Sequence, residues 1–262
     1  MRARKRFGQH FLRDEGVVAR IVAAIDPQPD DILVEIGPGH GVLTRALLER
    51  CTRLRAIEID RDLARELTAN LASGGRLEVL TADVLTVDFR ALRGTGPKLR
   101  LVGNLPYNIS TPLLFHLLDQ HDAFADAHFM LQKEVVARMA APPGSRTYGR
   151  LTVMLAPHCR VEPLFDVGPA AFRPPPKVTS TVARLIPHPR PPFEITDPAV
   201  FARVVAAAFS QRRKTLRNAL SALASPELMR EVGIDPGDRP ERIAPGQFAA
   251  LANHLSHAHR PV

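Results

Sequence analysis

Four consecutive residues, Asn104-Leu105-Pro106-Tyr107, combine groups that could hold a planar base carrying an exocyclic amine. Asn104 offers a side-chain carbonyl oxygen as an acceptor, Pro106 lacks a backbone donor, and Tyr107 offers an aromatic face for stacking. The apolar run before them, residues 99–103, is typical of a buried strand, so we expect the four residues to follow a strand end. They could instead form an ordinary turn, because Asn and Pro occur in many loops.

A second group of candidate residues follows an earlier apolar run at residues 32–36, where the chain continues through Gly37 and Gly39. Glycines let the backbone turn sharply and approach a ligand, although nucleotide and flavin sites use similar turns. Glu58 ends the next predicted strand, where its carboxylate could accept hydrogen bonds from both ribose hydroxyls. Asp83 follows a third predicted strand, and its oxygens could accept from an adenine amino group.

The glycine turn and the two carboxylates form a more specific pattern together than separately, because they follow successive predicted strands. No lysine of the Walker type follows the glycines, so the predicted site would hold a nucleoside without a cation for a triphosphate. This favours S-adenosylmethionine over NAD or ATP as the cofactor. Glu58 alone could equally be an exposed carboxylate at a strand end.

Alternating strands and helices must position these residues. Apolar runs predict strands at residues 32–36, 54–57, 77–80, 99–103 and 127–131, with later strands near 160–165 and 178–186. Helical spacing predicts helices at residues 14–25, about 61–71 and 133–141. The alternation is typical of an α/β fold with a doubly wound, mostly parallel sheet.

A proline-rich stretch at residues 187–192 is typical of a linker. Asp197 and Pro198 then provide a helix cap and a first helical residue, and the remaining sequence predicts several short helices. We therefore expect an S-adenosylmethionine-binding catalytic domain at residues 1–187. A small all-α domain should follow at residues 188–262.

The chain of 262 residues is 45% hydrophobic, which is enough for one α/β core and a smaller second unit. Lys and Arg number 35 against 27 Asp and Glu, and this net charge of +8 favours a polyanionic partner. A surplus of solvated arginines would give the same balance.

Two cysteines, Cys51 and Cys159, lie far apart and form no CxxC pair, so we expect no disulfide framework and no metal site. Few cysteines also favour a reducing, cytoplasmic location. No apolar run approaches the ~20 residues of a membrane span, and no apolar region follows the basic N-terminus. We therefore expect neither a membrane span nor a secretory signal.

Two basic clusters would suit phosphate contacts with a structured RNA. One is N-terminal and contains Arg4, Lys5 and Arg6. The other contains Arg212, Arg213, Lys214 and Arg217, which we place on a predicted helix with Arg213 and Arg217 one turn apart. Either cluster could instead be a solvated face or a loose terminus.

Segments along nearly the whole chain resemble the ribosomal RNA adenine N6-dimethyltransferases, and within that family the type acting on small-subunit RNA. The segments that carry the resemblance are residues 8–12 (GQHFL), 35–39 (EIGPG), 58–60 (EID), Asp83, 103–112 (GNLPYNISTP), 132–135 (QKEV), 148–151 (YGRL), 172–178 (FRPPPKV) and 209–218 (FSQRRKTLRN).

The resemblance implies a Rossmann-like class I methyltransferase. It further implies that S-adenosylmethionine is contacted by His10, Leu12, Gly37, Glu58, Asp83 and Asn104, while Gly39 belongs to the same glycine turn. His10 stands where many relatives carry Asn, and both side chains offer a donor and an acceptor. His10 could also cap a local turn, and Leu12 could be an ordinary core residue.

The resemblance also implies dimethylation of N6 of two adjacent adenosines in the 3'-terminal hairpin loop of small-subunit (16S) rRNA. In the expected chemistry, Asn104 and the carbonyl of Leu105 accept the amino hydrogens and free the nitrogen lone pair. Tyr107 stacks on the base, and Phe172 clamps its other face, although Phe172 could be a core residue instead. The target adenosine must be unpaired or turned outward.

The expected partners are small-subunit rRNA and the immature small ribosomal subunit, bound by a monomer in the cytoplasm. Two alternatives remain open. One is a large-subunit rRNA adenine N6-methyltransferase of the macrolide-resistance type. The other is a ribosome-assembly factor that binds RNA with little catalysis.

Overall fold

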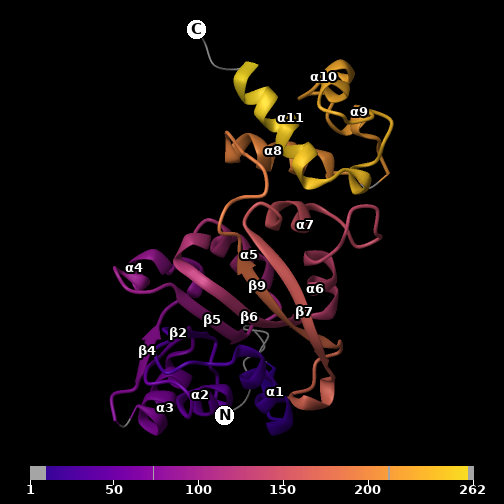
Figure 1. The fold of residues 1–262 in the computed structure, drawn as a ribbon. Coiled ribbons are helices and arrows are strands. Elements are labelled where there is room, and N and C mark those ends of the chain that lie inside the picture. Colours follow the sequence, from indigo (N-terminus) through magenta and orange to yellow (C-terminus); the bar gives the residue numbers. More distant parts are fainter. Residues whose placement is uncertain (1–9, 73, 212, 259–262) are drawn as a thin grey trace. The chain divides into compact units, whose positions relative to one another are not determined.

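The computed structural model describes residues 10–72, 74–211 and 213–258, and the chain divides into two compact units (Figure 1). The first unit comprises Met1–Val136 and Val161–Pro187, and the second comprises Ala137–Arg160 and His188–Val262. The chain passes between the units after residues 136 and 160, and again at the expected proline-rich stretch. Residues 137–160, expected in the catalytic domain, belong to the second unit, since Tyr148 and Val153 pack in its core.

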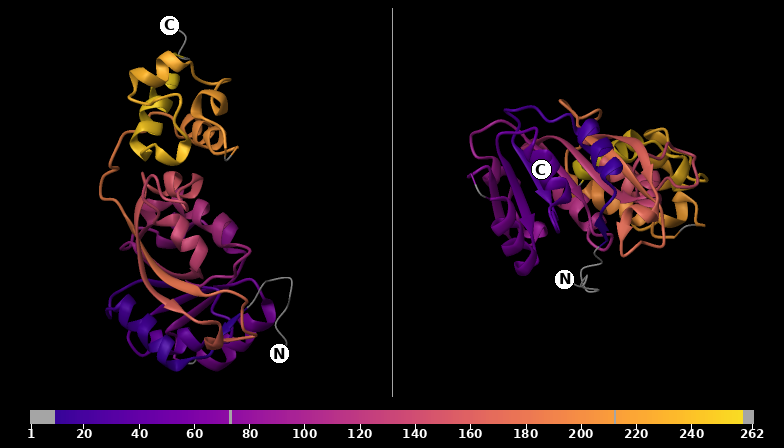
Figure 2. Two further views of the ribbon diagram at one scale, coloured as in Figure 1. Left: turned by 90° about the vertical axis from the view of Figure 1, so that its right-hand side faces the viewer. Right: turned by 90° about the horizontal axis from the view of Figure 1, so that it is seen from below.

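The first unit is built on a sheet of seven strands, counted in the described part of the chain, in the order β4-β3-β2-β5-β6-β9-β7. Their bounds are β2 Leu33–Ile36, β3 Leu54–Glu58, β4 Leu77–Thr81, β5 Leu99–Asn104, β6 Phe124–Gln132, β7 Cys159–Val167 and β9 Ser180–Pro187. Strands β2 to β6 are parallel, while β9 is antiparallel to β6. The expected doubly wound, mostly parallel sheet is confirmed, and the two views of Figure 2 show its twist.

Helices precede, connect and follow the parallel strands. They are α1 Glu15–Ile25, α2 Val42–Leu48, α3 Arg61–Leu71, α4 Phe89–Arg93, α5 Ser110–Leu118 and α6 Lys133–Met139, with single 3-10 turns at Val84–Thr86, His121–Ala123 and Pro169–Ala171. The carboxylate of Asp14 accepts from the N–H of Val17 at 3.0 Å and so caps α1. Asp60 caps α3 in the same way, accepting from Asp62 at 3.0 Å. These caps explain why both helices begin where the sequence predicts.

A separate antiparallel pair joins β1 (Phe11–Leu12) to β8 (Phe172–Arg173), with Leu12 opposite Phe172. The N–H of Arg13 donates to the carbonyl of Ala171 at 2.9 Å and extends this pairing. The short ribbon fixes the N-terminal segment of the described chain against residues 171–173.

The second unit is helical in its described residues. Its helices are α7 Arg150–Leu155, α8 Pro198–Ala208, α9 Leu216–Ala219, α10 Pro226–Glu231 and α11 Pro245–Ala258, with a 3-10 turn at Pro240–Arg242. Apolar side chains from these helices form one core around Phe201, Val204 and Phe248, each at most 2% exposed. None of the helices in the described ranges has the length and apolar character needed to cross a bilayer.

The helix predicted for the second basic cluster is wrong. Helix α8 ends at Ala208 and α9 begins at Leu216, so Arg213 and Lys214 lie in the connecting loop and Arg217 lies on α9. The backbone N–H groups of residues 216 and 217 donate to the carbonyls of residues 238 and 236, each at 2.9 Å, instead of continuing a helix from α8. Arg212 lies outside the described residues.

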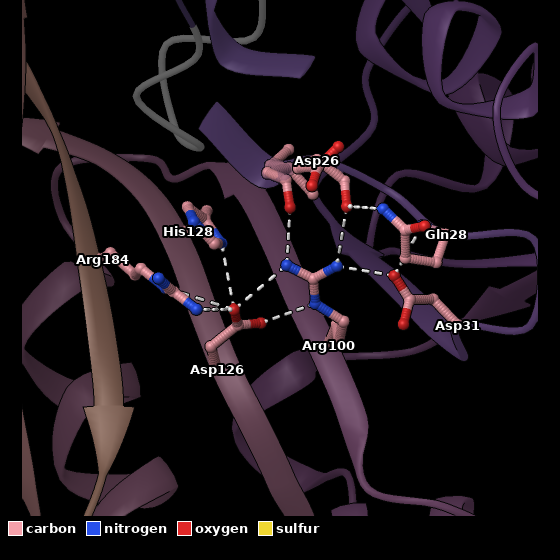
Figure 3. Close-up of polar contacts among 8 residues, drawn as sticks. Asp26, Gln28, Asp31, Arg100, Asp126, His128 and Arg184 are labelled. Atoms are coloured by element: carbon pink, nitrogen blue, oxygen red, sulfur yellow. Dashed lines mark hydrogen bonds and ion pairs between the residues drawn. The ribbon is translucent and has the colours of Figure 1, made fainter. Parts of the chain in front are cut away.

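Arg100 and Asp126 form a largely buried ion cluster at the amino ends of β5 and β6 (Figure 3). The Arg100 guanidinium donates to both carboxylate oxygens of Asp126 at 2.9 and 3.0 Å and to Asp31 at 2.5 Å. It also donates to the backbone carbonyls of Ile25 and Asp26, at the end of α1. All the donor positions of the guanidinium are therefore directed at acceptors, which joins the end of α1, the segment before β2, and strands β5 and β6.

Two further residues of Figure 3 face Asp126, Arg184 from the neighbouring strand β9 and His128 from β6 itself. Arg184 of β9 donates to Asp126 at 2.9 Å, and His128 Nδ1 lies 3.9 Å from the same carboxylate. Burial opposes ionisation of Asp126, but its hydrogen bonds with Arg100 outweigh that effect and lower its pKa. Burial also lowers the pKa of His128 to about 4, so this ring is neutral at pH 7.

We expect Asp126→Asn to lower the free energy of unfolding by about 3–5 kcal/mol, because two arginines lose a buried counter-charge. Urea denaturation measures the change. The matched control is Asp122→Asn, which removes the exposed Arg90–Asp122 pair and should cost at most about 1 kcal/mol. Equal losses of unfolding free energy in the two variants would contradict the claim that the buried Arg100–Asp126 cluster stabilises the fold more than the exposed pair does.

Candidate functional site

A pocket lies at the carboxyl ends of β4, β3, β2 and β5, which are neighbours in the sheet. Parallel strands place the residues that follow them at one edge, and ligands of open α/β sheets bind there. The lining residues are His10, Phe11, Ile36, Gly37, Gly39, Ile57, Glu58, Ile59, Ala82, Asp83, Val84, Asn104, Leu105, Pro106, Tyr107, Asn108 and Ile109.

The glycine turn between β2 and α2 forms one wall of the pocket. The N–H of Gly37 donates to the carbonyl of Ile57 at 2.9 Å, which ties the turn to β3. Gly39 has a φ of +57°, and a Cβ there would lie 2.9 Å from the Phe11 ring. Only glycine therefore combines this backbone conformation with the close approach of Phe11.

The carboxylate of Glu58 is held in place by two backbone donors. Its Oε2 accepts from the N–H of Gly39 at 3.2 Å, and its Oε1 accepts from the N–H of Asp60 at 2.9 Å. Burial raises the pKa of Glu58, and these hydrogen bonds counteract part of the rise. Because each carboxylate oxygen has two lone pairs, Glu58 keeps acceptor capacity for a ligand.

Asp83 presents a carboxylate beside apolar surface. Its Oδ1 accepts from the N–H of Leu85 at 3.0 Å and caps the following 3-10 turn. Ile59 lines the same pocket and is 46% exposed, unusually high for a large apolar side chain. A hydrogen-bond acceptor beside an apolar surface suits a purine, because the acceptor can bind its edge and the apolar surface can pack against its face.

Asn104 ends β5 with its amide in a fixed orientation. The Nδ2 donates to the carbonyl oxygen of His10 at 2.9 Å, which leaves Oδ1 as the acceptor. The N–H of Leu105 donates to the carbonyl of Met130 at 3.2 Å and continues the pairing with β6. A Cβ on Gly103 would lie 2.5 Å from the backbone oxygen of Ile36, so glycine lets β5 approach β2 closely just before Asn104.

Tyr107 is held by two side chains. Its hydroxyl lies 2.8 Å from Ser180 Oγ, and its ring centroid lies 5.4 Å from that of His10 at an interplanar angle of 34°. His10 Nδ1 in turn lies 2.8 Å from the carbonyl oxygen of Pro174. Burial raises the pKa of the Tyr107 phenol, which is neutral at pH 7.

Most of the residues predicted for cofactor and base therefore line one pocket: His10, Gly37, Gly39, Glu58, Asp83, Asn104, Leu105, Pro106 and Tyr107. Leu12 and Phe172 do not line it. They are 6% and 4% exposed and pack in the core of the first unit. Arg213, Lys214 and Arg217 lie in the second unit, while Arg4, Lys5 and Arg6 lie outside the described residues.

Sequence reasoning assigned no role to Glu35, Phe11 or Ile59. Glu35 of β2 is 2% exposed, and its Oε2 has no hydrogen-bond partner among the described residues. Burial raises the pKa of Glu35 to about 7, with a smaller contribution from the charge of Glu58. Its signal in the sequence is a carboxylate inside an apolar run. Among the described residues, no group of three His, Cys, Asp or Glu side chains could hold a metal ion.

Glu35→Gln should change how stability depends on pH. The raised pKa means that the folded protein holds this proton when the unfolded chain has lost it, so stability falls between about pH 5 and pH 8. A shift from 4.5 to about 7 corresponds to about 3 kcal/mol. We expect the variant to exceed the wild type in stability at pH 8 and to match it more closely at pH 5, as measured by urea denaturation.

The control for this experiment is Glu49→Gln, which changes an exposed carboxylate that follows α2. Its stability should follow the wild-type pH profile. If Glu35→Gln also runs parallel to the wild type from pH 5 to pH 8, Glu35 does not hold its proton in the folded state.

Comparisons with known proteins agree with this geometry. The chain is 56% identical over 255 residues to the ribosomal RNA small subunit methyltransferase A of Nitrosococcus oceani, covering 97% of this chain and 96% of the relative. It is 55% identical to the protein of the same name from Methylococcus capsulatus, covering 97% and 98%.

Solved structures show the same fold. A dimethyladenosine transferase from Plasmodium falciparum has a TM-score of 0.76 and 27% identity, covering 95% of this chain and 98% of that one. The 23S rRNA methyltransferase ErmE has a TM-score of 0.72 and 28% identity, covering 94% and 99%. The expected Rossmann-like class I methyltransferase fold is confirmed. The sequence model of the family described as ribosomal RNA adenine dimethylase matches residues 1–257, so the chain belongs to that family.

Proposed function

We propose that this protein transfers methyl groups from S-adenosylmethionine to N6 of two adjacent adenosines in the 3'-terminal hairpin loop of 16S rRNA. The observation that carries the proposal is the pocket itself, where the Asn104 acceptor opens onto the same space as Glu58 and Asp83. The names of relatives 54–56% identical to the chain support the small-subunit substrate.

The residues present fit S-adenosylmethionine. Glu58 would accept from the ribose hydroxyls, Asp83 would accept from the adenine amino group, and Ile59 would contact the adenine face. The turn at Gly37 and Gly39 leaves space that a Cβ would fill, next to the rings of Phe11 and His10. Leu12 is buried in the core of the first unit, next in sequence to Phe11, and would support the Phe11 ring. When bound, the cofactor supplies an activated methyl group on its sulfonium.

The acceptor pair at the end of β5 would activate the target amine. The N6 lone pair of adenine is delocalised into the ring, which makes the amine a poor nucleophile. Asn104 Oδ1 and the carbonyl oxygen of Leu105 would each accept one amino hydrogen, which draws N6 toward tetrahedral geometry and frees the lone pair. Holding N6 about 3–3.5 Å from the methyl carbon then gives a near-attack arrangement.

Aromatic stacking would hold the base in this geometry. Tyr107 lines the pocket and would stack on the target adenine, which is worth roughly 1–3 kcal/mol. Phe172 is 4% exposed, so its proposed contact with the other face requires its side chain to leave the core.

The distribution of charge supports RNA binding by the second unit. In the full sequence this unit contains 14 Lys and Arg against 7 Asp and Glu, whereas the first unit contains 21 against 20. Nearly all of the net charge of +8 therefore belongs to the smaller unit, where Arg213, Lys214 and Arg217 are exposed. We propose that the protein binds the immature small subunit as a monomer in the cytoplasm, where that substrate is assembled.

The large-subunit alternative has less support, because the 23S rRNA methyltransferase is only 28% identical to this chain.

The deciding experiment is transfer of labelled methyl groups to small subunits that lack adenine dimethylation, followed by primer extension. We expect label at two adjacent adenosines near the 3' end, and none with Asn104→Ala. Label only on large-subunit RNA would favour the alternative. RNA binding by the wild type without any transfer would favour an assembly factor.

Glu58→Ala should weaken binding of S-adenosylmethionine by roughly 10- to 100-fold, because charged acceptors for the ribose are lost. Isothermal titration calorimetry measures this affinity, and RNA affinity should remain unchanged. Glu78→Ala, which removes an exposed carboxylate paired with Arg55, is the control. Unchanged cofactor affinity in Glu58→Ala would exclude the ribose contact.

Replacing Arg213, Lys214 and Arg217 with Gln should weaken RNA binding and reduce its dependence on salt. Each lost phosphate contact lowers the slope of log K against log salt by about 0.7–0.9. Filter binding at several salt concentrations measures the slope. A control with Arg53, Arg65 and Arg76 of the first unit replaced by Gln should keep the wild-type slope. An unaltered slope in the first variant would remove these residues from the interface.

A further inference from the structure

The side chain of Ser180 contacts Tyr107, the pocket residue proposed to stack on the target base. Its Oγ is 2.8 Å from the Tyr107 hydroxyl, although the two residues are 73 positions apart in the sequence. Ser180 is fully buried, whereas Tyr107 is only partly buried and lines the pocket. A buried hydroxyl requires a partner, so the Tyr107 phenol occupies a defined position at this end of the ring.

The backbone around Ser180 is fixed by strand pairing. Ser180 is the first residue of β9 and lies opposite Gln132, the last residue of β6. The N–H of Lys133 donates to the carbonyl of Thr179 at 3.0 Å and extends this pairing. The antiparallel strand therefore brings a rigidly held hydroxyl to a site that is otherwise built at the ends of parallel strands.

We propose that Ser180 is a positioning residue for methyl transfer, which rests on the proposed function. Its hydroxyl holds the far end of the Tyr107 ring, while His10 lies against the ring 5.4 Å away. With both contacts present, the ring can neither swing outward nor rotate away, so its stacking face is set before the base enters. Without the Ser180 contact, the ring keeps its tilted packing against His10 but loses the hydrogen bond at its far end.

The next residue along β9 provides a matched control. Thr181 is also buried, but its hydroxyl donates to Asp166 Oδ1 at 2.6 Å, and Asp166 pairs with Lys133 at 2.5 Å. Successive residues of a strand point to opposite faces, so Thr181 does not contact Tyr107. Thr181→Val removes a buried hydroxyl from the same strand and spares the pocket.

The test measures single-turnover methyl transfer with saturating cofactor in Ser180→Ala, Tyr107→Phe and the double variant. Each single change should slow transfer about five- to twenty-fold, with cofactor affinity unchanged, because the base is held less well. The double variant should be no slower than Tyr107→Phe, since both changes remove the same hydrogen bond. Thr181→Val should transfer at the wild-type rate.

A spectroscopic readout separates positioning from a loss of stability. The chain has no Trp and two Tyr, so absorbance at alkaline pH follows the phenols, and Tyr107→Phe identifies the Tyr107 transition. Burial raises the pKa of the Tyr107 phenol and the Ser180 hydrogen bond counteracts part of that rise, so Ser180→Ala should move the transition to higher pH. Thr181→Val should leave it in place.

A wild-type rate of methyl transfer in Ser180→Ala would overturn the proposal for Ser180. A rate loss in the double variant equal to the product of the two single losses would also overturn it. So would an unmoved Tyr107 transition. These outcomes require an active wild type, whereas failure of the proposed function appears as a wild-type protein that transfers no methyl group.

Discussion

The site depends on four parallel strands that end side by side. Because β4, β3, β2 and β5 are neighbours, the residues that follow them meet at one edge, although Gly37 and Asn104 are 67 positions apart in the sequence. These residues are Asp83, Glu58, Gly37 and Asn104. Close contact between β2 and β5 requires Gly103, where a side chain would strike the backbone of β2. The cofactor contacts and the base contacts in the proposed mechanism therefore come from one feature of the fold.

Strand β5 carries both Arg100, the cation of the buried ion cluster, and the proposed activating amide of Asn104. Arg100 at its start is bonded to α1, Asp31 and Asp126 (Figure 3). Asn104 at its end is oriented by the carbonyl of His10. Such a strand cannot slide relative to β2 and β6 without breaking buried ion pairs. The ion cluster thus contributes to function through register, although it lies at the opposite end of the strand.

Local patterns were enough to predict the succession of strands along the chain. They also predicted most of the pocket residues, because the carboxyl ends of neighbouring parallel strands lie at one edge of the sheet. They failed where contacts with residues distant in the sequence determine the local structure. The helix expected around Arg213 is a loop, and the first residues of the next helix, 216 and 217, donate to the carbonyls of residues 238 and 236. Likewise, nothing local indicates that Ser180 reaches Tyr107, since that contact needs the antiparallel pairing of β9 with β6.

The central claim is that two oxygens at the end of β5 receive the amine of the target adenine. The most direct measurement is a crystal structure of this protein with adenosine and a non-reactive cofactor analogue bound. The account predicts N6 within hydrogen-bond distance of Asn104 Oδ1 and of the Leu105 carbonyl oxygen, with the analogue's ribose on Glu58. An adenine amine held away from both oxygens, or a cofactor ribose bound away from Glu58, would contradict it.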